Sequence, residues 1–350
     1  MKKKIIVLAP FIKTGGPRAL HSVANHLYET GLDVSIFYYA RGREYRGKPL
    51  YDDCIVPVEE VLKDDDNNIL IIPEVATKLI EKYPRSKVII WWLSVDYYLE
   101  KSTAYRTITR LKRGGYPYIF FPFAYIYFFY GKMRRNEGFR KIPINKMSPD
   151  ILHVFNSNYV REFLKNNGII DEQMLFLCSY IDGLGVKKDE CISDKENIIV
   201  FNPTKSDSLY MKYVLNEIHK LDASIKCVPI RNMDHEQVLK LLKKSKLFID
   251  LGFFPGPDRL PREAVSLFCN IITSNMGCAG NQDDFPFSND YKYSTTRGNI
   301  RIIANKAVKM VYGYSDYIED FNVYRNKVER QKQEFEIQFS KLVSIINDEQ

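Results

Sequence analysis

Two arginines lie at the expected start of a helix, a position that normally disfavours cations. Pro261 suits the first turn of a helix, and Arg259 and Arg262 stand on either side of it. Because a helix N-terminus is the positive end of the macrodipole, each cation there costs about 0.3–1 kcal/mol. Guanidinium groups beside free backbone N–H groups would bind a phosphate or diphosphate, and the Glu263 carboxylate would accept hydrogen bonds from a ribose. The alternative is that Asp258 and Glu263 pair with the two arginines at the surface.

A glycine pair follows the first expected strand, at the end where a parallel sheet can bind a ligand. The apolar run 5–9, the helical pattern after Pro17 and the apolar run 34–39 predict a strand, a helix and a second strand. Open α/β sheets bind ligands beyond the carboxyl ends of their strands. Gly15 and Gly16 lie at that end and would let a phosphate approach the backbone closely.

Asp96 is another candidate for chemistry at a strand end. It comes shortly after the buried run 88–92, so its carboxylate would lie at the same edge of the sheet as the glycine pair. There it would serve as a general base or accept a hydrogen bond from a substrate. The alternative is an ordinary turn or helix N-cap residue.

The order of the elements predicts an α/β fold with two domains. Apolar runs alternate with helical periodicities in both halves of the chain. A chain of 350 residues is also too long for one ordinary core. The polar run 187–197 is the expected boundary. We therefore expect two doubly wound domains, 1–186 and 197–325, that face each other across a cleft, followed by a helix over 326–350.

Composition and charge restrict the class of protein. The hydrophobic content of 45% and the charged content of 27% are typical of a soluble globular protein. The net charge of +8 fits an anionic ligand or an anionic membrane surface. The basic residues are spread along the chain without a nucleic-acid-binding motif, so no nucleic-acid partner is expected.

The cysteines, the histidines and the N-terminus favour a cytoplasmic protein without a metal or cofactor. The six cysteines are scattered and include no C-x-x-C pair, which predicts reduced thiols. The five histidines show no metal-ligand spacing. The N-terminal apolar run 5–9 meets Pro10 and is too short for a signal peptide.

Residues 114–131 form an uncharged aromatic segment between basic residues. The segment is too short for a comfortable membrane span and contains Pro117 and Pro122. Aromatic rings with a basic rim suit the surface of an anionic membrane. We therefore predict that residues 114–135 contact the inner face of the membrane or form a groove for an acceptor lipid. The alternative is burial against the first domain or in a dimer interface.

The segment 251–274 resembles a motif of the GT-B glycosyltransferases, above all of the retaining family 4. In that family E-G-F-G-L-P-x-x-E-A precedes a short helix and an apolar strand that ends in Ser, and LPREA (260–264) and CNIITS (269–274) follow this layout. The family's second Glu holds the ribose of the nucleotide-sugar, and Glu263 occupies its place. Pro255 stands where the family has its first Glu. The resemblance favours retention of anomeric configuration, but this departure leaves the stereochemistry open.

The resemblance implies transfer of a sugar from a nucleotide-sugar to a surface glycan or lipid-linked acceptor, as in capsule or lipopolysaccharide synthesis. It implies two Rossmann-like domains and a C-terminal helix that returns to the first one. The reaction would need no metal, because cationic side chains would stabilise the leaving nucleotide. The residues assigned by the resemblance are Lys205, Arg259 and Arg262 at the phosphates, Arg231 and Asn232 at the base, Gly15, Gly16 and Gly277 in loops near the donor, and Arg18 and His21 as weaker candidates. The alternative for Lys205 is a plain surface lysine, and the alternative for His21 is a helix residue that faces solvent or packs locally. The alternative for the whole protein is a non-catalytic GT-B-like scaffold or nucleotide-binding protein in polysaccharide assembly.

Overall fold

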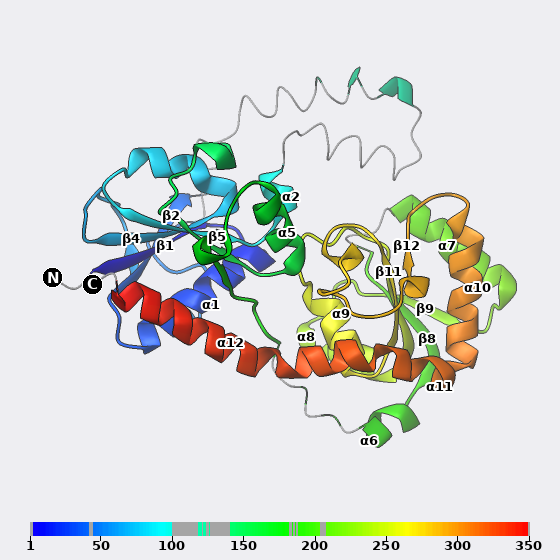
Figure 1. Cartoon of the computed structure of the whole chain (residues 1–350). Coiled ribbons are helices and arrows are strands. Elements are labelled where there is room, and N and C mark those ends of the chain that lie inside the picture. The colour runs from blue at the N-terminus through cyan, green and yellow to red at the C-terminus, as the bar shows by residue number, and fades with distance from the viewer. Residues whose placement is uncertain are drawn as a thin grey trace.

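The computed structural model describes residues 3–41, 45–99, 118–120, 122–123, 126, 141–181, 184, 186, 188–203 and 208–348. Within these residues the chain forms two separate parallel sheets with helices around them (Figure 1). The first sheet lies in the N-terminal half and the second in the C-terminal half, as the order of apolar runs predicted. A long C-terminal helix runs along both halves (Figure 1).

The N-terminal sheet contains, in the described part of the chain, seven strands in the order β3-β2-β1-β4-β5-β6-β7. They are β1 (Lys4–Pro10), β2 (Val34–Ala40), β3 (Val58–Glu59), β4 (Asn68–Pro73), β5 (Lys87–Trp92), β6 (Leu152–Phe155) and β7 (Met174–Phe176). Alternate residues of β1 enter different cores: Ile5 packs with α1 (Gly15–Glu29), whereas Ile6 packs with η1 (Glu74–Lys82), α2 (Val95–Tyr98) and α5 (Asn158–Asn166). Burial on both faces explains why these strands are continuous apolar runs.

The C-terminal sheet contains five strands among the described residues, in the order β12-β11-β10-β8-β9. They are β8 (Glu196–Phe201), β9 (Lys226–Pro229), β10 (Ser245–Asp250), β11 (Asn270–Ser274) and β12 (Lys292–Tyr293). The helices around this sheet are α7 (Ser208–Leu221), α8 (His235–Lys244), α9 (Arg259–Ser266), α10 (Asn299–Tyr312) and α11 (Tyr314–Tyr317). The expected boundary 187–197 contains a short helix, α6 (Lys188–Ser193), and Cys191 of this helix is buried in the C-terminal core.

The helix α12 (Asn322–Asp348) joins the two domains. Its first turns contribute Tyr324 and Val328 to the C-terminal core, and its later turns contribute Phe335 and Phe339 to the N-terminal core. The predicted return of the C-terminal helix to the first domain is therefore confirmed. The helix begins at Asn322, four residues before the predicted boundary at 326.

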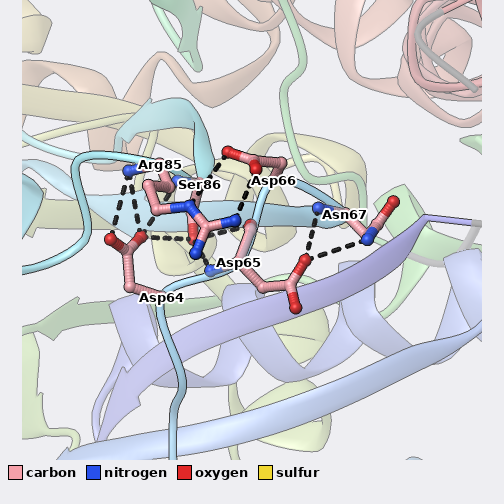
Figure 2. Close-up of polar contacts among 6 residues, drawn as sticks. All are labelled: Asp64, Asp65, Asp66, Asn67, Arg85 and Ser86. Atoms are coloured by element: carbon pink, nitrogen blue, oxygen red, sulfur yellow. Dashed lines mark hydrogen bonds and ion pairs between the residues drawn. The ribbon is translucent and has the colours of Figure 1, made fainter.

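An acidic run, Asp64 to Asp66, lies just before β4 and makes polar contacts with Arg85 and Ser86 just before β5 (Figure 2). The run therefore lies at the amino ends of these two strands. Asp64 accepts the backbone N–H groups of Arg85 at 3.0 Å and Ser86 at 3.1 Å. Asp66 accepts Arg85 Nη2 at 2.6 Å, and Asp65 accepts the N–H of Asn67 at 2.9 Å. These contacts tie the turn before β4 to the turn before β5. The two strands are thus held in register at their start, and they deliver Glu74 and Leu93 at their far ends.

Candidate functional site

The carboxyl ends of the two sheets meet at Leu93. A Cβ added to Gly16 would lie 3.6 Å from Leu93 Cδ1, which places the β1–α1 loop beside the end of β5. A Cβ added to Gly256 would lie 3.2 Å from Leu93 O and 3.3 Å from Asn156 Nδ2, so the β10–α9 loop of the second domain touches the first domain. Asn156 also donates to Leu93 O at 3.1 Å. The structure therefore brings the predicted glycine pair and the predicted arginine-rich segment to one junction.

A carboxylate of the second domain caps a helix of the first. Asp284 accepts the backbone N–H groups of Asn158 and Tyr159 at 2.8 Å each, at the start of α5. Asn281 donates to Glu162 on the same helix at 2.8 Å. Burial raises the pKa of Asp284, while the two backbone N–H groups oppose this rise. These contacts hold the two sheet edges facing each other.

Glu263 lies in a polar cluster at the start of two helices. The helix α8 begins at His235 because Asp234 caps it and forms a capping box with Gln237. His235 Nε2 lies 2.8 Å from Glu263 Oε1, and Arg259 Nε donates to the same oxygen. Arg259 Nη2 lies 2.8 Å from His235 Nε2. The Glu263 side chain is 1% exposed, whereas the side chains of His235 and Arg259 are about half exposed.

Both contacts of Glu263 fall on one carboxylate oxygen. In the described part of the chain, no polar side chain contacts Oε2. A carboxylate oxygen can accept two hydrogen bonds, so Oε2 is able to accept from a ligand hydroxyl. The cluster thus combines a buried acceptor with the accessible cation Arg259.

Arg262 does not share this cluster. It is 4% exposed and donates from Nη1 to Ser179 O at 2.7 Å and to Gln331 Oε1 at 2.9 Å. Its Nε donates to Asp258 O at 3.2 Å. These acceptors belong to the interdomain segment, α12 and the β10–α9 loop. The structure therefore gives Arg262 a structural role at the domain junction, which differs from the predicted contact with a diphosphate.

Asp96 lies in the first turn of α2, near the end of β5. Its Oδ1 accepts the Tyr159 hydroxyl at 3.1 Å, which links α2 to α5. The helix N-cap is Ser94, whose side chain accepts the N–H of Tyr97 at 3.3 Å. The N-cap alternative for Asp96 is therefore wrong, and the carboxylate stays at the sheet edge where the sequence placed it.

The predicted loop glycines have different surroundings. Among the described residues, no atom outside its own helix and chain neighbours would lie within 4 Å of a Cβ at Gly15, so this start of α1 is open to that part of the chain. Gly277 has a φ of +64°, and a Cβ there would come within 2.1 Å of Phe254 O. Gly277 and Phe254 form a bridge between the two loops. The backbone therefore requires glycine at 277 whether or not a ligand binds beside it.

The remaining predicted residues divide into three groups. Lys205 lies outside the described residues. Arg231 and Asn232 are exposed in the loop between β9 and α8, just before His235, and Asn232 has a left-handed φ of 54°. The weaker candidates make contacts within the first domain. His21 is buried against Pro17 O and the Tyr38 hydroxyl, which agrees with the alternative of local packing. Arg18 forms a bidentate ion pair with Asp53.

Two residues of this region escaped the sequence analysis. His235 follows the clear cap Asp234, but its partners are remote in sequence. Glu74 directly follows the buried strand β4, which is the same signal that pointed to Asp96. It is 2% exposed, and its Oε2 accepts the N–H of Leu93 at 3.0 Å. Burial raises the pKa of Glu74 to about 7.

The described residues include neither a candidate metal site nor a candidate membrane-spanning helix. They contain no group of three or more His, Cys, Asp or Glu side chains that could hold a metal ion. None of their helices combines the length and the apolar character that crossing a bilayer requires.

No protein-family model and no curated protein sequence matches the chain. Solved structures share its architecture at low sequence identity. HepE of Anabaena in complex with UDP matches with a TM-score of 0.59 and 11% identity, over 99% of this chain and 100% of HepE. TarM of S. aureus, in a complex that contains UDP, matches with a TM-score of 0.51 and 13% identity over 83% of this chain. The chain spans just over half of TarM, at 57%.

A third solved structure extends the comparison. WaaG, a glycosyltransferase involved in lipopolysaccharide biosynthesis, matches with a TM-score of 0.52 and 10% identity, over 98% of this chain and 99% of WaaG. These neighbours are GT-B glycosyltransferases. Together with the two parallel sheets and the returning helix, they show that the chain has the GT-B fold.

Proposed function

We propose that the protein is a glycosyltransferase that moves a sugar from a nucleotide-sugar to a surface-glycan or lipid-linked acceptor in the bacterial cytoplasm. The observation that carries the proposal is Glu263, a buried carboxylate at the start of α9 beside the cation Arg259. Its Oε2 contacts no polar side chain of the described residues. The GT-B neighbours support it, because HepE was solved with UDP-glucose and TarM with UDP and α-GlcNAc-glycerol.

The donor would lie against the second domain. Glu263 Oε2 accepts a ribose hydroxyl, and Arg259 contacts the diphosphate. Arg231 and Asn232 flank the base in the loop before α8. Gly15, at the open start of α1, lies across the junction and gives the phosphates access to backbone N–H groups. Lys205 is assigned to the diphosphate from the sequence alone.

The acceptor would approach from the first domain. Asp96, at the carboxyl end of the N-terminal sheet, is the proposed contact for its reacting hydroxyl. The proposal includes a metal-independent reaction, in which cationic side chains stabilise the departing nucleotide. It also includes retention of anomeric configuration, which follows from the resemblance of the 251–274 segment to family 4 and not from the contacts of the site.

The test is a transfer assay with a panel of UDP-, GDP- and CMP-sugars, run with and without a chelator. Glu263→Gln should lower kcat/KM by at least about tenfold, the usual cost of a lost hydrogen bond to a charged group. Glu236→Gln is the matched control. Glu236 is an exposed carboxylate of α8 that pairs with Lys240 of the same helix. Nucleotide binding without any transfer would favour the non-catalytic scaffold. Absence of both would reject the proposal.

We also propose that residues 114–135 contact an anionic membrane surface. Four described residues of this segment are large, apolar and at least half exposed: Ile119, Phe120, Phe123 and Ile126. Basic residues flank the segment in the sequence, which suits anionic headgroups. Replacing Phe120 and Phe123 by Ser should weaken co-sedimentation with anionic vesicles, whereas Ile302→Ser, at an exposed apolar residue of α10, should not. Equal binding of both variants would reject this surface.

A further inference from the structure

The imidazole of His235 meets two partners at one atom. Its Nε2 lies 2.8 Å from Glu263 Oε1 and 2.8 Å from Arg259 Nη2. A ring nitrogen either carries a proton and donates, or has a lone pair and accepts. Because both neighbours face the same nitrogen, His235 can serve Glu263 or Arg259 but not both at once.

The surroundings favour the contact with Glu263. The Glu263 side chain is 1% exposed, so water cannot easily replace a lost donor. The Arg259 side chain is 58% exposed, and its terminal nitrogens have access to solvent. When Nε2 carries the proton, it donates to Glu263 together with Arg259 Nε. The terminal nitrogen Nη2 of Arg259 then has no acceptor on the ring and is available to an anion.

The charges around this ring come from two helices. Of the described charged residues, Arg259 and Glu263 of α9 contact the imidazole. On its own helix the neighbouring charges are used elsewhere: Asp234 caps the helix, and Glu236 pairs with Lys240 at 2.7 Å. The proton on Nε2 therefore acts mainly on the balance between Glu263 and Arg259.

We propose that His235 is a positioning residue whose protonated Nε2 holds Glu263 and thereby releases Arg259 to the diphosphate of a nucleotide-sugar. The inference rests on the proposed function, because it assigns the released guanidinium to the donor of that reaction. A ring whose proton lies on Nδ1 alone would instead leave a lone pair on Nε2, which would accept from Arg259 Nη2 and leave Glu263 with one donor fewer. Donor binding therefore depends on an N–H donor at this position, and a side chain without one weakens it.

The first test measures the affinity for UDP-glucose in two variants of His235 and one control. UDP-glucose is a suitable probe because its diphosphate would meet the guanidinium of Arg259 directly. His235→Gln retains an N–H donor, His235→Phe keeps a ring without one, and His219→Gln replaces another exposed histidine, in the last turn of α7. We expect H235F to bind about fivefold more weakly than wild type, the usual cost of one lost hydrogen bond, and H235Q and H219Q to bind like wild type. Wild-type affinity in H235F overturns the inference and leaves the proposed function intact.

The second test needs no nucleotide. Imidazole ¹⁵N NMR locates the ring proton in the ligand-free protein, with the His235 signals assigned by their loss in H235Q. We expect the proton of the neutral ring to lie mainly on Nε2, and a proton mainly on Nδ1 overturns the inference. If neither UDP-glucose nor any other nucleotide tested binds the wild type, the proposed function fails, and the assignment of Arg259 to a donor fails with it.

Discussion

Arg262 donates to Gln331 Oε1 at 2.9 Å and so ties α9 to the helix that joins the two domains. The same nitrogen donates to Ser179 O, which lies in the segment between the domains. One guanidinium therefore links three parts of the chain. Because it is 4% exposed, these contacts are shielded from water and are stronger than surface contacts.

Arg262→Ala should lower the free energy of unfolding by about 2–4 kcal/mol, because it leaves buried acceptors without a donor. Chemical denaturation measures this loss. Arg330→Ala, at an exposed position on α12, is the control and should change little. A fall in nucleotide affinity at unchanged stability would contradict the structural role and restore the predicted diphosphate contact.

Asp284→Asn should weaken the contact between the domains. The change removes the negative charge at the start of α5 and one of two acceptors for the N–H groups of Asn158 and Tyr159. The expected cost is about 1–2 kcal/mol, as for other helix caps. Small-angle scattering should show a larger radius of gyration, whereas the exposed Asp283→Asn should leave both quantities unchanged. Identical scattering of the two variants would show that Asp284 does not hold the domains together.

Glu74→Gln should change how stability depends on pH. Burial raises the folded-state pKa of Glu74 to about 7 from the ordinary value of 4.5. The folded state therefore binds this proton more tightly than the unfolded state, and the contribution to stability falls as pH rises from about 4.5 to 7. The full loss is about 3 kcal/mol. Denaturation across this window should show a flatter profile for Glu74→Gln, and wild-type behaviour for the exposed Glu81→Gln. Parallel profiles of wild type and Glu74→Gln would contradict the assignment.

Two glycine substitutions separate a backbone requirement from a ligand contact. Gly277→Ala should cost about 3 kcal/mol or more, because its φ is +64° and a Cβ would lie 2.1 Å from Phe254 O. Gly15→Ala should change stability by no more than about 0.5 kcal/mol, since the described part of the chain places no packing neighbour within 4 Å of the added Cβ. Thermal unfolding measures both. If Gly15 faces the donor as proposed, its variant should lose transfer activity while remaining stable, and full activity would remove Gly15 from the site.

The sheets were predictable because each strand carries its signal locally. The run 34–39 became β2 (Val34–Ala40), and 88–92 became β5 (Lys87–Trp92), each within one residue. Parallel strands that are buried on both faces read as unbroken apolar runs. The start of α8 also depends on residues that are close in the sequence, since Asp234 and Gln237 form its capping box.

The side-chain partners of the site were less predictable, because they come from distant segments. The charges near the helix start suggested that Arg262 binds an anion. Its acceptors are instead Ser179 O, 83 residues away, and Gln331 Oε1, 69 residues away. His235 meets Glu263 across 28 residues, and no spacing rule connects them. The sequence identified the helix start that carries Glu263, while the packing of α8 and α12 decides which arginine reaches the surface.

The most direct test of the central claim is a crystal structure of the protein with bound UDP or a UDP-sugar. We predict that a ribose hydroxyl lies within hydrogen-bond distance of Glu263 Oε2, with Arg259 at the diphosphate. A nucleotide bound elsewhere on the chain, with the Glu263 carboxylate still bound to His235 and Arg259 and not to a ribose, would contradict the proposed donor site.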